Sequence, residues 1–368
     1  MLCTKSRFLK ISSSIFYSLI ILFSIFVIAI KLYKLNWPKL LNKFCYFAVK
    51  ISAPELCEAS HKNDFLDKFE NSEQNQDYEN NFQKYSPKDL QNENKSCFSD
   101  ILDNFTNYKI LETQFGKSGT KCSNFYIKNK TGKNINFDKY FNKKPRISIK
   151  NKRKILVLIY HTHTSESYIE KNTDIIPKNF NFRTQDNNKN IVAVGKKLAE
   201  TLKKNGISVI HDTTVHDFPN YNGAYNRSAA TIKKYINKYS QIPIIVDLHR
   251  DSIGDSKTGR IKPVFRAKNN KKAAQIMLVC GCGINKSLKF SHWEKNLSLA
   301  LNLQNICEEK FPGLTRELII KNVVYNQNLT PGATLIEVGS DVNTLEESNL
   351  AAQMLGESIF YFLKKFAK

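Results

Sequence analysis

The chain has 368 residues, 41% of them hydrophobic, and a formal net charge of +23 from 56 Lys and Arg against 33 Asp and Glu. This length allows two domains of ordinary size or one domain with a long appendage, and the charge favours an anionic partner such as acidic lipid or a wall polymer. The basic residues are dispersed and the eight cysteines contain no CxxC pair, so the composition indicates neither a nucleic-acid-binding helix nor a zinc knuckle.

The first predicted element is a membrane anchor. Residues 11–30 are 20 uncharged, mostly apolar residues between Lys10 and Lys31, enough for a helix to cross about 30 Å of hydrocarbon. No small-residue cleavage site follows them. We therefore expect a cytoplasmic tail over 1–10, a transmembrane signal anchor over 11–31 and a soluble part outside the cytoplasm, where nucleic acid is not a partner.

Residues 32–150 are predicted to be a polar spacer with local structure. The stretch ENSEQNQDYENNFQKYSPKDLQNENKS is poor in aliphatic residues and rich in polar ones. Such a composition cannot bury enough apolar surface to fold by itself. Short apolar pieces such as FCYFAVKISAPEL allow local helices or docking segments.

Residues 151–368 are predicted to form a catalytic domain of the α/β class. Strands are expected at 154–161, 207–211, 242–249, 273–280 and 333–339, and helices at 190–206, 227–239, 293–311 and 344–362. The last helix begins with Thr344 and Glu347 at the spacing of a capping box. Alternating strands and helices indicate βαβ units, hence a mostly parallel or mixed sheet flanked by helices.

Imidazoles and carboxylates follow three of the predicted strands. His161, His163 and Glu166 come after the first strand, His249 ends the third and Glu337 lies in the last. The carboxyl ends of parallel strands share one edge of a sheet, where ligands bind. We expect these side chains to meet there, with His211 and His216 in a nearby loop.

This residue set indicates a catalytic zinc site. Histidine and carboxylate ligands without thiolate are typical of Zn²⁺ in hydrolases, which keep one position open for water. A carboxylate outside the ligand set acts as general base toward that water and as general acid toward the leaving amine. Glu337 is the candidate for this role.

Four motifs together resemble the stage II sporulation protein P family. They are HTHTSESY, VIHDTTVHDFPNYNGAYNRS, VDLHRDS and YNQNLTPGATLIEVGSDVNTLEES, and the resemblance covers about residues 150–368. Members of that family are membrane-anchored cell-wall hydrolases similar to zinc-dependent N-acetylmuramoyl-L-alanine amidases. The resemblance therefore implies an amidase-like fold, a Zn²⁺ cofactor and hydrolysis of an amide in peptidoglycan.

The resemblance also implies roles for individual residues. The metal ligands would be His163 or His161, Asp186 and His249, with Glu166 as an alternative to Asp186 and Glu337 as the catalytic carboxylate. Arg227, Arg250 and Asn343 are candidates for substrate binding. The choice between the two histidines, and between the two carboxylates, stays open at this stage.

The resemblance implies hydrolysis of the bond between muramic acid and L-alanine, with endopeptidase activity on cross-links, during sporulation engulfment. It also implies a location at the septal or forespore-engulfing membrane, and the anchor places the catalytic domain on the extracytoplasmic side. Expected partners are peptidoglycan and the membrane and, by the resemblance, stage II sporulation proteins D and M. The alternatives are a non-catalytic peptidoglycan-binding scaffold subunit and a zinc peptidase that cuts a different bond.

Overall fold

The computed structural model describes residues 107–145, 147, 155–239, 242–255, 259–267, 270–283 and 290–367, which all belong to one compact unit. The predicted tail, the predicted anchor over 11–31 and most of the predicted spacer lie outside the described residues. None of the helices in the described ranges combines the length and the apolar composition needed to cross a membrane.

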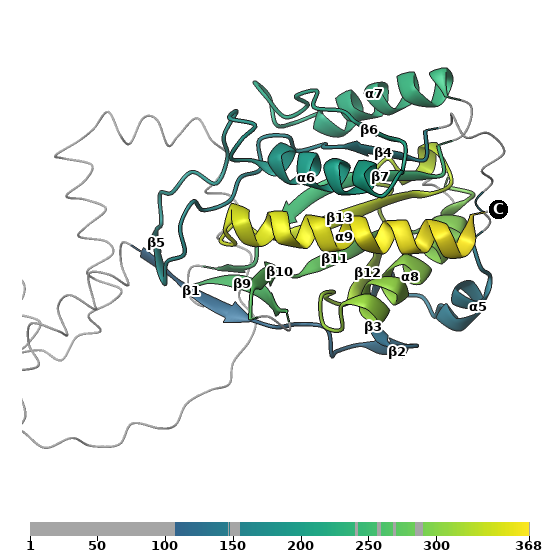
Figure 1. Ribbon diagram of the computed structural model, residues 1–368, viewed down its shortest axis with the longest axis horizontal. Helices are drawn as coiled ribbons and strands as arrows, with labels where there is room; N and C mark the ends of the chain where they lie inside the picture. The colour runs from purple at the N-terminus through teal and green to yellow at the C-terminus, as the bar shows by residue number, and fades with distance from the viewer. Residues whose placement is uncertain are drawn as a thin grey trace, which may run out of the picture. The chain divides into compact units, whose positions relative to one another are not determined.

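The main sheet has eight strands in the order β2-β3-β12-β11-β13-β7-β4-β6 (Figure 1). Their bounds are Thr120–Cys122 for β2, Phe125–Lys130 for β3, Val157–Tyr160 for β4, Val209–His211 for β6, Ile244–Asp251 for β7, Ile276–Gly281 for β11, Leu318–Lys321 for β12 and Ala333–Ser340 for β13. Strands β6, β4, β7 and β13 run parallel to one another, whereas β11 is antiparallel to β13. The predicted α/β class with a mixed sheet is confirmed.

Three helices cover one face of this sheet, and Figure 1 shows α6 and α9 lying across it. They are α6 (Ile191–Lys204), α8 (Trp293–Lys310) and α9 (Leu345–Phe366). The Asn190 side chain caps α6 by accepting a hydrogen bond from the backbone N–H of Val192 at 2.9 Å. The predicted capping box of Thr344 and Glu347 is present at the start of α9.

Helix α7 (Ala224–Lys238) covers only part of the opposite face. Its Ile232 packs with Leu158 of β4 and Ile245 of β7 in a separate apolar cluster. Because side chains alternate along a strand, the odd-numbered residues of β7 and β13 point to this face, while Leu248 and Ile336 belong to the main core. The same face of β13, β11 and β12 lines a cavity instead.

Part of the predicted spacer belongs to the folded unit. Strand β1 (Asn107–Thr113) pairs in parallel with β9 (Gly259–Arg266), and β3 pairs in parallel with β12. The smaller sheet has the order β10-β9-β1-β5, with β8 paired to β9. Its other strands are β5 (Ile175–Pro177), β8 (Gly254–Asp255) and β10 (Lys272–Ala274), and the remaining helices are α5 (Phe137–Asn142) and the short 3-10 helix η2 (Gln327–Leu329).

Candidate active site

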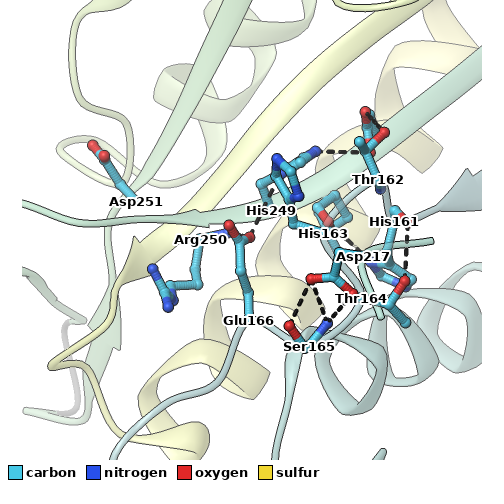
Figure 2. Close-up of polar contacts among 12 residues, drawn as sticks. His161, Thr162, His163, Thr164, Ser165, Glu166, Asp217, His249, Arg250 and Asp251 are labelled. Carbon is cyan, nitrogen blue, oxygen red and sulfur yellow. Dashed lines mark hydrogen bonds and ion pairs between the residues drawn. The ribbon is translucent and has the colours of Figure 1, made fainter. Parts of the chain in front are cut away.

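The loop after β4 carries His161, His163 and Glu166, and it lies against the end of β7 (Figure 2). His161 is fully buried, and both of its ring nitrogens are engaged: Nδ1 lies 2.9 Å from the carbonyl oxygen of Leu248 and Nε2 lies 2.8 Å from Nε2 of His211. Burial lowers the pKa of His161 to about 3. His161 is therefore a packed structural imidazole rather than a group that faces the cavity.

His163 lines the cavity, and one of its ring nitrogens lacks a partner among the described residues. Its ring stacks on Tyr221 with centroids 4.5 Å apart, and Nε2 lies 3.1 Å from the Tyr221 hydroxyl. Its Nδ1 is buried and has no hydrogen-bond partner among the described residues. Burial, with the nearby charge of His249, lowers the pKa of His163 to about 4, so the imidazole is neutral near neutral pH.

His249 is held between two carboxylates. Nδ1 lies 3.4 Å from Oε2 of Glu166, and Nε2 lies 2.9 Å from Oδ1 of Asp247. The contact between Nε2 and Asp247 is short enough for an ion pair, but its angle does not suit a hydrogen bond. Nε2 therefore has no hydrogen-bond partner among the described residues. Burial lowers the pKa of His249, but the Asp247 and Glu166 carboxylates outweigh it and raise the pKa well above its usual value.

Glu166 is the carboxylate that the fold brings to the two histidines. It is buried, and its Oε2 also accepts a hydrogen bond from the backbone N–H of Arg250 at 3.1 Å. Burial raises its pKa, but the hydrogen bond from His249 and the charges of His249 and Arg250 outweigh burial and lower the pKa to about 2. Glu166 is therefore ionised at neutral pH.

Asp186 does not reach this site. Its side chain is exposed and accepts hydrogen bonds from the backbone N–H of Asn188 at 2.9 Å and from the Asn188 side chain at 3.1 Å. It thus closes a local turn ahead of α6. Of the two carboxylates left open by the sequence, the geometry places Glu166, and not Asp186, beside the histidines.

Glu337 lies across from His249, because these two residues are paired in the register of β13 and β7. Its Oε2 is buried and has no partner among the described residues. Burial raises the pKa of Glu337 to about 8. Glu337 lines a cavity of about 210 Å³ together with His163, Glu166 and His249.

The three predicted substrate-binding residues are engaged elsewhere. Arg227 donates to backbone carbonyls of residues 216, 220 and 222, and it thereby holds the loop before α7. Arg250 donates to the carbonyl oxygens of Ser167 and Phe182. Asn343 is buried and accepts from the backbone N–H of Ser340 at 2.8 Å. None of the three lines the cavity.

Sequence reasoning missed several residues that shape the site. Asp247 orients His249. It lies two residues before His249 in the same strand, so strand alternation alone could have predicted that the two side chains share a face. Tyr221 and Tyr225 contact the His163 ring, with centroid distances of 4.5 and 5.7 Å. They come from the loop before α7 and its first turn, inside one of the motifs that carry the family resemblance, but nothing in that motif distinguishes them as site residues.

The described residues contain no group of three or more His, Cys, Asp or Glu side chains arranged as a preformed metal site. The donor set nevertheless fits Zn²⁺, because imidazole nitrogen and carboxylate oxygen are its usual ligands in hydrolases. Three buried atoms without aligned partners belong to this site: His163 Nδ1, His249 Nε2 and Glu337 Oε2. To bind a metal, His249 would have to give up its contact with Asp247 or with Glu166, so that one ring nitrogen faces the ion.

Comparison with known proteins identifies the family. The model of the family described as stage II sporulation protein P matches residues 41–360. The stage II sporulation protein P of Bacillus subtilis (strain 168) is 30% identical over 224 residues, which are 55% of this chain and 51% of that protein, so the chain spans about half the length of this curated relative.

Two solved amidases show weaker similarity. N-acetylmuramoyl-L-alanine amidase AmiC2 of Nostoc punctiforme has a TM-score of 0.35 and 15% identity, covering 58% of this chain and 98% of that one. The CwlD amidase of Clostridioides difficile, solved with the GerS lipoprotein, has a TM-score of 0.34 and 14% identity, covering 57% and 97%. Scores this low carry no argument about function, whereas the family match extends over most of the sequence. The chain belongs to the stage II sporulation protein P family.

Proposed function

We propose that the chain is a peptidoglycan hydrolase of sporulation engulfment that cleaves the amide between muramic acid and L-alanine, and that it also cleaves peptide cross-links. Membership of the stage II sporulation protein P family supports action on the cell wall. A signal anchor over 11–31 would hold the catalytic domain at the extracytoplasmic face of the membrane. Stage II sporulation proteins D and M are the proposed partners.

The observation that carries the proposal is the state of Glu337. A carboxylate with a buried, unpartnered oxygen and a pKa raised to about 8 costs stability, and such groups cluster at catalytic sites. Glu337 faces the same cavity as His163, His249 and Glu166. A carboxylate tuned toward neutral pH suits general acid and base chemistry on an amide.

In this proposal His163, His249 and Glu166 hold Zn²⁺. When bound, the ion polarises the substrate carbonyl and lowers the pKa of a water molecule. Glu337 takes a proton from the attacking water at its free oxygen and passes it to the leaving nitrogen. Tyr221, stacked on His163, keeps that ring in place, and the Nδ1 atom, which has no hydrogen-bond partner among the described residues, would be the ligand atom.

The test is the release of soluble fragments from purified peptidoglycan by a Glu337→Gln variant, which keeps the side-chain shape and removes the proton-accepting group. We expect the rate to fall by about 10²–10⁴-fold. The matched control is Glu346→Gln, at an exposed position in the first turn of α9, which should keep the wild-type rate. Wild-type activity in the Glu337→Gln protein would refute the proposed role.

A further inference from the structure

The register of the three strands β13, β11 and β12 arranges one continuous surface beside Glu337. Met277 is opposite Glu337, Val279 is opposite Leu335 and Ile319, and Lys321 is opposite Gly281. Alternation along each strand therefore puts Glu337, Met277, Val279, Ile319 and Lys321 on the same face. All of these residues and Leu335 line the cavity.

This surface has an acidic end and an apolar floor. Glu166, Asp251 and Glu337 line the end next to His249. The floor is a small apolar cluster separate from the main core, formed by Met277, Val279 and Leu335 with Ile319 and Tyr325 packed against it. An apolar floor favours apolar groups of a ligand, because a polar group placed there would lose its hydrogen bonds to water.

Lys321 supplies a positive charge at the other end of the floor. It is half-buried, and it makes no ion pair or side-chain hydrogen bond with the residues that the structure describes. Of the neighbouring cations, Arg316 lies 2.8 Å from Asp251 and Lys128 on β3 lies 3.4 Å from Glu317, whereas Lys130, which is opposite Lys321 in the register of β3 and β12, is exposed and does not line the cavity. A half-buried ammonium without a partner is a ready site for an anionic group.

The rim over the floor is fixed by two residues in an unfavourable backbone conformation. Tyr325 has φ 48° and Asn326 has φ 56°, a region that costs non-glycine residues roughly 1–3 kcal/mol and often marks functional sites. The Asn326 side chain donates to the carbonyl oxygen of Tyr225 at 2.8 Å and to Oγ of Ser228 at 3.0 Å. These contacts hold Tyr325, with its ring 6.1 Å from that of Tyr225, in place at the cavity before any ligand binds.

We propose that the surface from Glu337 to Lys321 is a subsite for a short peptide that carries a free carboxylate. The cleaved amide lies at Glu337, small apolar groups of the peptide lie on the floor, and the carboxylate pairs with Lys321. This inference rests on the proposed amide hydrolysis at this site.

The spacing limits the length of that peptide. Glu337 on β13 and Lys321 on β12 are two strands apart, at about 4.8 Å per strand, and their partners on β11, Met277 and Gly281, are four residues apart, at about 3.3 Å per residue. The two backbones are therefore about 16 Å apart. The two side chains shorten this gap, and an extended peptide advances about 3.3–3.6 Å per residue. The carboxylate should therefore lie about two to four residues from the cleaved amide.

The test compares Lys321→Met and Lys321→Arg with the wild-type chain on two synthetic muramyl tripeptides, one with free carboxylates and one with all of them converted to carboxamides. Lys321→Met should raise KM for the acidic substrate about tenfold and leave kcat unchanged, because one charge-assisted hydrogen bond is lost from binding. Lys321→Arg should restore most of the affinity. All three proteins should have the same KM for the carboxamide substrate.

Two outcomes would overturn the inference. If Lys321→Met has the wild-type KM for the acidic tripeptide, the lysine does not bind the carboxylate. If it raises KM equally for both tripeptides, the lysine acts on the glycan or on folding. In either case the tripeptides are still hydrolysed and Glu337→Gln still removes the activity, so failure of this inference is distinguishable from failure of the proposed function.

Discussion

His163 and His249 have opposite surroundings although their ring centroids are only 5.3 Å apart. His163 is buried under Tyr221 with a lowered pKa, whereas Asp247 and Glu166 keep His249 protonated. Metal binding requires neutral imidazole, so loading of the site must release the His249 proton. Zinc affinity should consequently increase as the pH rises.

Measurements of zinc affinity also decide whether Glu166 or Asp186 is the carboxylate ligand. We expect His163→Ala and Glu166→Gln to weaken zinc binding by at least about 100-fold, because each removes a ligand atom. Asp186→Asn is the matched control and should retain wild-type affinity, since Asp186 is exposed and bound to Asn188. Competition with a chromogenic chelator measures all of these affinities. A large loss in Asp186→Asn with none in Glu166→Gln would reverse the assignment.

A pH effect on stability should come from His211, away from the ligand set. Burial lowers its pKa to about 4, so the folded chain holds it neutral while the unfolded chain protonates it below about pH 6.5. The stabilisation is complete above about pH 6.5 and is lost as the pH falls toward 4, by an amount on the order of 1–3 kcal/mol.

Urea unfolding of the metal-free chain at pH 7.5 and pH 5 measures this effect. His211→Asn should lose less stability between the two pH values than the wild-type chain. Thr213→Ala, an exposed change in the loop that follows His211, should behave like the wild type. An unchanged pH dependence in His211→Asn would show that another group titrates.

At the scale of elements, local patterns predict most of the catalytic sheet and its helices. Helices α6 and α8 lie within the predicted ranges, α7 begins three residues before the predicted start, at Ala224, and α9 continues four residues past the predicted end, to Phe366. The single strand predicted at 273–280 is divided at Gln275 into β10 and β11. The Gln275 side chain bonds the backbone of Phe115 and Gly313, which are distant contacts that no local pattern reveals.

The site itself is only partly predictable from the sequence, because part of it also depends on contacts between distant residues. His249 and Glu337 can be placed because they lie within strands, where alternation fixes the face of each side chain. His161, His163, Glu166 and Asp186 lie in loops, where rotation of the backbone decides which side chain faces the cavity. Lys321 and Tyr325 reach the cavity only through pairing of β12 with β11 and the turn after it.

Helix α6 supports the site through Gly195. A Cβ atom there would lie 2.6 Å from Nε2 of His211 and 2.7 Å from the ring of His161. Gly195→Ala should destabilise the fold by about 1–3 kcal/mol through this clash, although alanine is the better helix former by about 1 kcal/mol. Denaturant unfolding checks this, with Lys196→Ala at the neighbouring exposed position as the control. A stabilised Gly195→Ala chain would mean that the two imidazoles can move aside.

At the scale of the whole molecule, residues 107–142 complete both sheets. Strand β1 pairs with β9, β3 pairs with β12, and Phe125, Ile127 and Phe137 are part of the main core. Partners this far apart in sequence cannot be recognised from composition, which is why the region reads as a spacer. Without these residues, the edges of β12 and β9 and part of the core become exposed.

Two fragments test this contribution. A fragment of residues 87–368 should be monomeric and unfold cooperatively on heating, whereas a fragment of residues 151–368 should aggregate or lack a cooperative transition. Size-exclusion chromatography and thermal unfolding by circular dichroism give the comparison. A stable, cooperative 151–368 fragment would show that the first strands are dispensable.

Amide hydrolysis between glycan and stem is tested most directly by mass spectrometry of purified peptidoglycan digested with the full chain in the presence of Zn²⁺. The expected products are free stem peptides and glycan without peptide, both absent when the Glu337→Gln chain is used. Products in which every glycan keeps part of its stem, with no free stem peptide released, would instead identify a peptidase. Release of the same products by the Glu337→Gln chain would contradict the assignment of Glu337 as the catalytic carboxylate.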